Sequence, residues 1–162
     1  MKIALGADGY GFDLKQEIKN YLVEKGLEIE DVGINDADAP TPYYQTASEV
    51  AKQMANRQVD RAILICGTGM GMAIIANKHP GIYAAPCENT GTARMSRSIN
   101  NSNILTLGGL ITTPRVAQDI VDVWLNTEFT QDWESPIQAW LHNSMKDIAQ
   151  LETQQFSRLH QA

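Results

Sequence analysis

The sequence is short of the residues that mark several common kinds of protein. Of its 162 residues only two are cysteines and three are histidines, and they are scattered along the chain. Without a C-x-x-C pair or a histidine cluster, the sequence predicts neither a disulfide framework nor a structural zinc site. No stretch approaches the roughly 18 consecutive apolar residues of a membrane helix, so no membrane span is predicted.

Positive charge is also scarce, with 13 lysines and arginines against 19 aspartates and glutamates, a net charge of −6. An acidic chain has no broad attraction for nucleic acid or anionic membranes, so neither is expected as a partner. The N-terminal run MKIALGADGYGF carries one lysine and soon meets Asp8, which is unlike a signal peptide. We therefore expect a cytoplasmic protein.

Apolar residues make up 43% of the chain, enough for one hydrophobic core. No linker or internal repeat divides the sequence. We expect a single domain over residues 1–162, with a core in 1–129 and a C-terminal helix in 135–160.

Apolar runs and amphipathic segments alternate along the chain. The runs predict strands at 2–6, 27–32, 61–66, 82–86 and 104–107, and helices are predicted at 12–25, 44–56, 73–78, 92–98 and from Thr113-Pro114. Strands that are each followed by a helix are typical of a three-layer α/β/α sandwich with a mostly parallel, Rossmann-like sheet. An extra helix from Ser135-Pro136 carries an apolar stripe that favours packing, for instance against a second subunit, over chemistry.

Ligands of such folds bind beyond the carboxyl ends of the strands, where the strand order reverses. Three segments qualify as candidates: Ala7–Gly11, Cys66–Met72 and Cys87–Gly91. If strands one and three are neighbours in a 2-1-3 order, Asp8 and Cys66 face each other across one cleft.

The segment CGTGMGM, residues 66–72, is the most informative stretch. Alternate glycines leave backbone N–H groups unobstructed at a helix start, which suits an anion or a developing oxyanion. A thiol beside them has its thiolate stabilised, so Cys66 is a candidate for acyl transfer, phosphoryl transfer or proton abstraction next to a carbonyl. The alternative is a small buried hydrophobe at a strand end, but the glycine pattern favours the functional interpretation.

Other candidates have two interpretations each. Asp8 either caps the first helix or serves the site, and Tyr43 belongs either to the core or to the cleft. Arg94 is either a solvated helix charge or a ligand for a phosphate group. The side chain of Met70 is expected to pack, and Cys87 is expected in the core.

Four stretches carry a family resemblance: KIALGADGYGFDLK, DRAILICGTGMGMAIIANKHPGIYAA, ARMSRSINNSNILTLGG and VAQDIVDVWLNTEF. Over residues 1–129 the chain resembles the type B ribose-5-phosphate isomerases and the related galactose-6-phosphate isomerase subunits. The resemblance implies an aldose–ketose isomerase that works through a cis-enediolate, without metal or organic cofactor. It also implies a homodimer or higher homo-oligomer with the site at the subunit boundary.

The resemblance also assigns roles to individual residues. Cys66 matches the family's proton-shuttling base, Thr68 its assisting threonine and Asp8 its aspartate near the sugar. Asn100 matches the asparagine of a later motif. The backbone amides that would hold the enediolate oxygen map to the loop residues Gly67, Gly69, Met70 and Gly71.

Departures from the family pattern point away from ribose 5-phosphate. Gly9 and Ile99 stand where the ribose enzymes carry histidines, the second of which opens the furanose ring. Leu110 stands where they carry a phosphate-binding arginine, and DWESPIQAWLHNS replaces a segment rich in arginine and histidine. A short sugar phosphate that cannot close a furanose ring would need no ring-opening histidine.

Two hypotheses follow from these departures. In the first, the protein isomerises a different sugar phosphate, held by Arg94, Arg97 or Arg115 from a partner subunit, or a neutral sugar stacked on Trp133 and Trp140. In the second, it is a non-catalytic or helper subunit of a hetero-oligomeric isomerase. The retained Cys66 favours the first.

Overall fold

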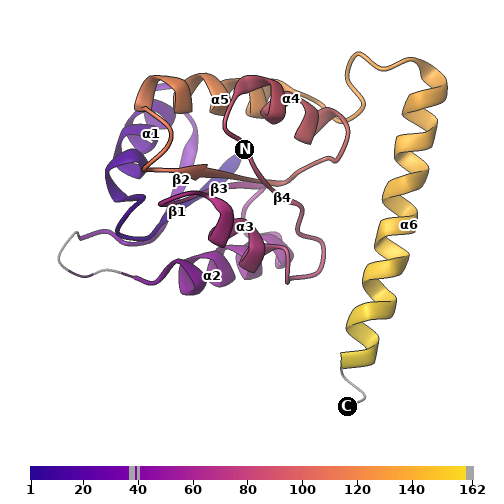
Figure 1. Cartoon of the computed structure of the whole chain (residues 1–162), viewed down its shortest axis with the longest axis horizontal. Coiled ribbons are helices and arrows are strands. Elements are labelled where there is room, and N and C mark those ends of the chain that lie inside the picture. The colour runs from indigo at the N-terminus through magenta and orange to yellow at the C-terminus, as the bar shows by residue number, and fades with distance from the viewer. Residues whose placement is uncertain (37–38, 40, 160–162) are drawn as a thin grey trace.

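In the computed structural model the chain forms a five-stranded sheet between two layers of helices (Figure 1). The structure describes residues 1–36, 39 and 41–159. All the strand pairs are parallel and the order is β2-β1-β3-β5-β4, which confirms the predicted sandwich and its 2-1-3 arrangement. The elements are β1 (Lys2–Ala7), α1 (Phe12–Glu24), β2 (Glu28–Gly33), α2 (Tyr43–Ala55), β3 (Arg61–Cys66), α3 (Met70–Ala76), β4 (Ala84–Pro86), α4 (Thr90–Ser98), β5 (Ile104–Gly108), α5 (Pro114–Asn126) and α6 (Ser135–Leu159).

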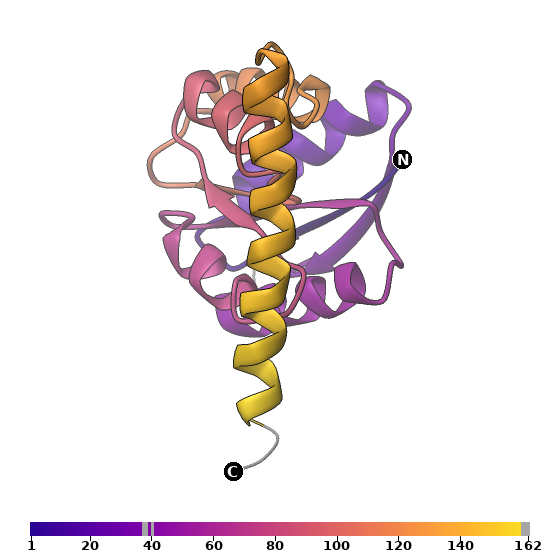
Figure 2. The ribbon, with the colours of Figure 1, turned by 90° about the vertical axis from the view of Figure 1, so that its right-hand side faces the viewer.

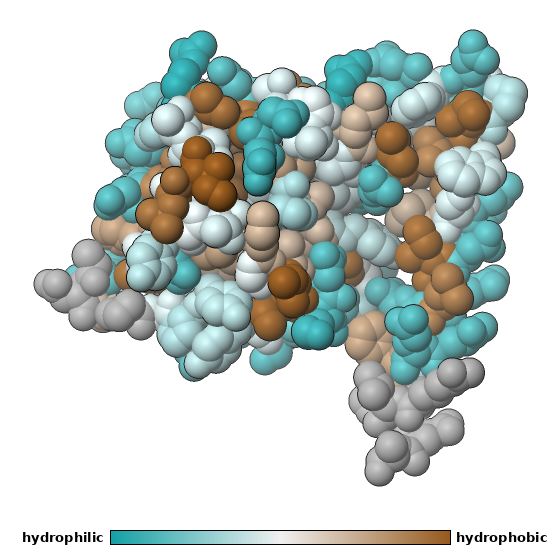
Figure 3. Space-filling model, viewed as in Figure 1, coloured by the Kyte–Doolittle hydropathy of each residue, from teal (hydrophilic) through white to brown (hydrophobic). Residues whose placement is uncertain are grey.

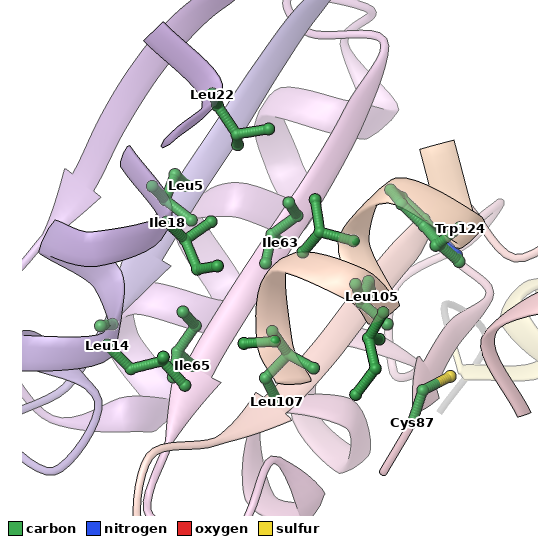
Figure 4. Packing of buried hydrophobic residues seen from close by; sticks show 14 of the residues in the cluster. Leu5, Leu14, Ile18, Leu22, Ile63, Ile65, Cys87, Leu105, Leu107 and Trp124 are labelled. Atoms are coloured by element: carbon green, nitrogen blue, oxygen red, sulfur yellow. The ribbon is translucent and has the colours of Figure 1, made fainter. Parts of the chain in front are cut away.

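Two apolar clusters hold the helices to the sheet. Leu5, Ile63 and Leu105 meet Ile18 of α1 and Trp124 of α5, all fully buried, on one face (Figure 4). The other face is built from smaller side chains of the central strands, against α2 and α3. Each large side chain removed from water contributes about 1.5–3 kcal/mol, so the sheet is a rigid base for the loops at its edge.

The start of α3 differs from the sequence prediction. The helix begins at Met70 rather than at residue 73, because Gly69 adopts a left-handed conformation (φ +78°) that turns the chain directly into a helix. A helix that begins among glycines has no apolar periodicity in its first turn, so its start was not visible in the pattern. Gly26, in contrast, ends α1 with φ +78°, as its position predicted.

Helix α6 lies beside the sandwich and extends past it (Figures 1 and 2). Its first turns are anchored where Leu141 is buried and the rings of Phe129 and His142 meet at 4.9 Å. Farther along, the Glu152 carboxylate accepts the Gly81 N–H at 2.8 Å. Apolar side chains of α6 remain on the surface (Figure 3), and the side chain of Trp140 is 63% exposed. No helix in the described part of the chain has the length and apolar character to cross a bilayer.

Candidate functional site

The carboxyl ends of four strands lie level with one another. Ala7 is in register with Gly33 and with Ile65, and Ile65 is in register with Leu107. Parallel strands that end together direct the chain segments after them to one edge of the sheet. The loops after β1, β2, β3 and β5 therefore meet there, at the point where the strand order reverses.

Close backbone approaches bind these loops into one unit. A Cβ on Gly11 would lie 2.2 Å from the Ile65 carbonyl oxygen, and one on Gly109 would lie 2.3 Å from that of Tyr10. Only glycine permits such approaches. The loop after β1 is thus held between the end of β3 and the loop after β5.

The expectation that Asp8 caps the first helix is wrong, because the N-cap of α1 is Gly11 and no side chain caps it. The Oδ1 of Asp8 accepts the N–H groups of Tyr10 and Gly11, each at 3.0 Å, so the carboxylate shapes the turn before α1. It is 9% exposed and also lines a cavity. Burial raises the pKa of the Asp8 carboxyl, and the two N–H donors only partly oppose this increase.

Cys66 ends β3 with its thiol turned into the glycine loop. The side chain is 6% exposed, and Sγ accepts the N–H of Gly69 at 3.2 Å. Thr68 is exposed, and its Oγ1 accepts the Met70 N–H at 3.3 Å, which leaves its hydroxyl proton to donate elsewhere.

The loop amides beyond Gly69 open α3. Gly71 and Met72 belong to the first turn of that helix, where a helix offers its N–H groups no internal acceptor. The side chain of Met72 is buried and that of Met70 is 52% exposed, so the expectation that Met70 packs is wrong. The segment therefore supplies backbone donors rather than side chains to the site.

A cavity of about 380 Å³ opens at this edge between two walls. The loop after β1 provides Asp8, Gly9 and Tyr10, and the chain entering α2 provides Thr41, Pro42 and Tyr43. The Tyr43 ring also lies against the glycine loop, since a Cβ on Gly71 would fall 2.9 Å from its Cε2. Of the two interpretations of Tyr43, the structure supports the cleft.

Leu110 forms an apolar rim over the glycine loop. Its N–H donates to the Gly67 carbonyl at 3.0 Å, and its Cδ1 lies 3.2 Å from where a Gly67 Cβ would be. Leu110 is 70% exposed and Tyr10 is 72% exposed. Sequence reasoning did not name Tyr10 or Thr41 as site residues, although Tyr10 lies in a candidate segment.

Several predicted site residues lie elsewhere in the protomer. Asn100 and Ile99 follow α4 and precede β5, so they are at the opposite, amino edge of the sheet from Cys66. Arg94 forms an ion pair with Asp132 on the outer side of α4. Within one chain, Asn100 and Arg94 are not brought to the glycine loop.

The third candidate segment, Cys87–Gly91, follows β4, the edge strand beyond β5, and does not join the cavity. Cys87 is 2% exposed in the apolar core, as expected, and burial raises the pKa of its thiol. Arg97 is also buried, with hydrogen bonds to the carbonyls of Thr127 and Ser102. Burial, and then the nearby charge of Arg61, lower the pKa of Arg97 to about 10.

The two histidines in the described residues lie away from the cavity. His79 hydrogen-bonds to Ser48 and to the Ile75 carbonyl, both at 3.2 Å, between α2 and α3. The His142 ring meets the Phe129 ring edge to face near the start of α6. Across the described ranges, no group of three or more His, Cys, Asp or Glu side chains is arranged to hold a metal ion.

Comparison with known proteins identifies the family. A ribose/galactose isomerase family model matches residues 3–139. The chain is 43% identical to a 4-deoxy-4-sulfo-D-erythrose isomerase of Clostridium sp. (strain MSTE9), over 94% of this chain and 96% of that protein. It is 38% identical to a D-erythrulose-4-phosphate isomerase of Pectobacterium atrosepticum, over 84% of this chain and 90% of that protein.

A solved structure agrees with this match. The ribose-5-phosphate isomerase B of Clostridium thermocellum superposes with a TM-score of 0.86 at 39% identity, covering 95% of this chain and 99% of that one. The chain therefore belongs to the ribose/galactose isomerase family, whose members are aldose–ketose isomerases.

Proposed function

We propose that this protein interconverts the aldose and ketose forms of a four-carbon sugar that carries an anionic group on C4. The observation that carries the proposal is the thiol of Cys66, whose Sγ accepts the Gly69 N–H at 3.2 Å beside a row of backbone amides. An enediolate reaction needs one base and one oxyanion stabiliser, and this loop offers both.

In the proposed mechanism, the Cys66 thiolate removes the proton from C2 of the aldose. The electron pair of that C–H bond forms the C1–C2 double bond, and the carbonyl electrons move to O1. The amides at the start of α3, including Gly71, stabilise the resulting negative charge. The hydroxyl of Thr68 carries a proton between O2 and O1, and the thiol returns its proton to C1, which completes the ketose.

Asp8 serves this reaction from the cavity wall. Its Oδ1 is used by the turn, so we assign its other oxygen to a substrate hydroxyl. The Tyr43 ring closes the opposite wall, beside Gly71. The reaction as written uses proton transfers alone.

The lining of the cavity supports the proposed substrate class. Opening a furanose ring requires an acid–base group at the ring oxygen, and the cavity wall has Gly9, without a side chain, next to Asp8. Both histidines in the described ranges are engaged elsewhere. A tetrose whose C4 oxygen is substituted or replaced cannot close a furanose ring, so it reaches the site already open. Two relatives named for such four-carbon sugars support this assignment.

We also propose that the protein acts as a homodimer. The apolar side chains Ile137, Trp140, Ile148 and Leu151 of α6 are 40–63% exposed in a single protomer. A second copy would cover them. In such a dimer Asn100, which is remote from Cys66 in its own chain, can approach the site of the other copy.

A substrate panel followed by NMR tests the proposal. The isolated chain is given D-erythrose 4-phosphate, D-ribose 5-phosphate, D-galactose 6-phosphate and D-erythrose. We expect turnover of D-erythrose 4-phosphate, with kcat/KM at least roughly a hundredfold above that for D-ribose 5-phosphate. Equal or better turnover of ribose 5-phosphate would show that the site opens rings. Full activity of the isolated chain would also exclude the helper-subunit hypothesis.

A further inference from the structure

Lys15 is a fully buried lysine that the proposed mechanism does not use. It lies on α1 and is 0% exposed. Its Nζ donates to Asp31 Oδ1 at 2.6 Å, to Asn35 Oδ1 at 3.0 Å and to the Ile34 carbonyl. These acceptors match the three N–H donors of an ammonium group, so the buried charge is fully compensated.

The three acceptors share one location, at the end of β2 and in the residues directly after it. Ile34 also donates its N–H to the Ala7 carbonyl at 3.2 Å, immediately before Asp8. The lysine therefore ties the start of the loop after β2 to α1. Helix α1 in turn begins directly after the turn that Asp8 shapes.

These two segments lead to the two walls of the cavity. The loop after β1 supplies Asp8 and Tyr10, and the loop after β2 leads to Thr41 and Tyr43. We propose that Lys15 is a positioning residue that sets the spacing of the two cavity walls. Only the kinetic test of this inference rests on the proposed isomerase function.

Packing does not explain a lysine at this position. Leu14, Ile18 and Leu22 already anchor α1 to the sheet. An apolar side chain of similar length would be buried without the desolvation cost of a charge. What the ammonium adds is direction, because its three acceptors fix the position of Ile34 and Asn35 relative to α1. Buried ionic groups have such a specifying role in some proteins.

The matched control is Lys19, whose Nζ contacts the other oxygen of the same carboxylate, Asp31 Oδ2, at 2.6 Å. Lys15→Met and Lys19→Met each remove one lysine from Asp31, but only Lys15 reaches Ile34 and Asn35. A milder variant, Asn35→Ala, removes one loop acceptor at an exposed position and keeps the Lys15–Asp31 ion pair. Asn35→Ala replaces Lys15→Met as the test variant if Lys15→Met does not fold.

Two readouts are measured on the full chain. The first is kcat and KM for D-erythrose 4-phosphate. The second is the ¹⁹F NMR spectrum of protein labelled with 3-fluorotyrosine, which places Tyr10 on one wall and Tyr43 on the other among five tyrosines. Tyr10→Phe and Tyr43→Phe assign the two signals.

For Lys15→Met we expect KM to rise at least about tenfold while kcat changes much less, because Cys66 is carried by β3. The Tyr43 signal should shift in Lys15→Met and, by less, in Asn35→Ala, but not in Lys19→Met. The proposal would be overturned if the Tyr10 and Tyr43 signals were unchanged in both Lys15→Met and Asn35→Ala. Equal effects of Lys15→Met and Lys19→Met on these signals would also overturn it. If the wild type converts none of the sugars, the proposed function fails, but the fluorine spectra still decide the role of Lys15.

Discussion

The carboxyl group of Asp8 is buried at the site, and its burial has a consequence for stability. A carboxyl whose folded-state pKa is raised contributes most stability below its unfolded pKa and loses it as the pH rises through the folded pKa. Ionised Asp8 is therefore unfavourable for folding at neutral pH. Asparagine keeps the acceptor for the N–H groups of Tyr10 and Gly11 but carries no charge.

We expect Asp8→Asn to raise the melting temperature at pH 7 and to lower turnover. The gain in melting temperature over the wild type should disappear at about pH 3, where the wild-type carboxyl is protonated as well. Thermal unfolding followed by circular dichroism at both pH values checks this. A gain of equal size at both would show that the charge of Asp8 is not its cause.

Leu110 offers a second test at the level of one side chain. Because it is 70% exposed above Gly67, an arginine there loses little packing and places a cation beside the glycine loop. We expect Leu110→Arg to lower KM for D-erythrose 4-phosphate several-fold, by about 0.5–1 kcal/mol of binding. Leu110→Gln is the control for size and polarity, and steady-state kinetics is the measurement. An equal KM in both variants would argue that the anionic group does not approach this rim.

Individual site residues were predictable to different degrees. Cys66 and its glycines could be found in the sequence because one continuous segment holds both thiol and amides. Tyr10 and Leu110 could not be paired with that segment, since their contact depends on how the loops after three different strands pack. The remote position of Asn100 follows from the direction of α4 relative to the sheet.

Among the elements, the connection from β3 to α3 packs tightly against β5 at Gly69. A Cβ on Gly69 would lie 3.0–3.2 Å from backbone atoms of Leu107, and its φ of +78° is unfavourable for other residues. Gly26 has the same φ, but a Cβ there would meet nothing within 4 Å. Substitutions at Gly26 therefore report the cost of the left-handed conformation alone. Substitutions at Gly69 report that cost together with a steric clash with β5.

We expect Gly26→Ala to cost about 1–2 kcal/mol of unfolding free energy, the usual penalty of a left-handed residue. Gly69→Ala should cost more and should also reduce turnover, since it displaces the amide that faces Cys66 Sγ. Urea denaturation with parallel kinetics checks both. If the two variants lose equal stability and Gly69→Ala keeps full activity, the tight packing of this loop is irrelevant to the site.

Elements were easiest to predict where one face or both are buried. The run Arg61–Cys66 is β3 to the residue, because a central strand covered on both sides is continuously apolar. The edge strand β4 has only three residues, so its expected start at residue 82 was two residues early. The placement of α6 beside the sandwich was not predictable, since an apolar stripe does not reveal what covers it.

At the scale of the whole molecule, α6 determines the predicted assembly. Trp140 is 63% exposed within the apolar stripe, whereas the exposed Thr153 lies about 140° around the helix from it. We expect the wild type to have twice the chain mass of 17.9 kDa in light scattering after size exclusion. Trp140→Glu should shift the protein toward the monomer, while Thr153→Glu, which adds the same charge, should not. A wild-type monomer would contradict the proposed dimer.

The thiol of Cys66 is the centre of the proposed chemistry, and its removal is the most direct test. Cys66→Ala is compared with the wild type by NMR for conversion of D-erythrose 4-phosphate, after unfolding curves have shown that both proteins are folded. Loss of a catalytic base is expected to lower kcat by about 10²–10⁴-fold, with little change in stability. Turnover by folded Cys66→Ala at a rate near that of the wild type would contradict the assignment of Cys66 as the base.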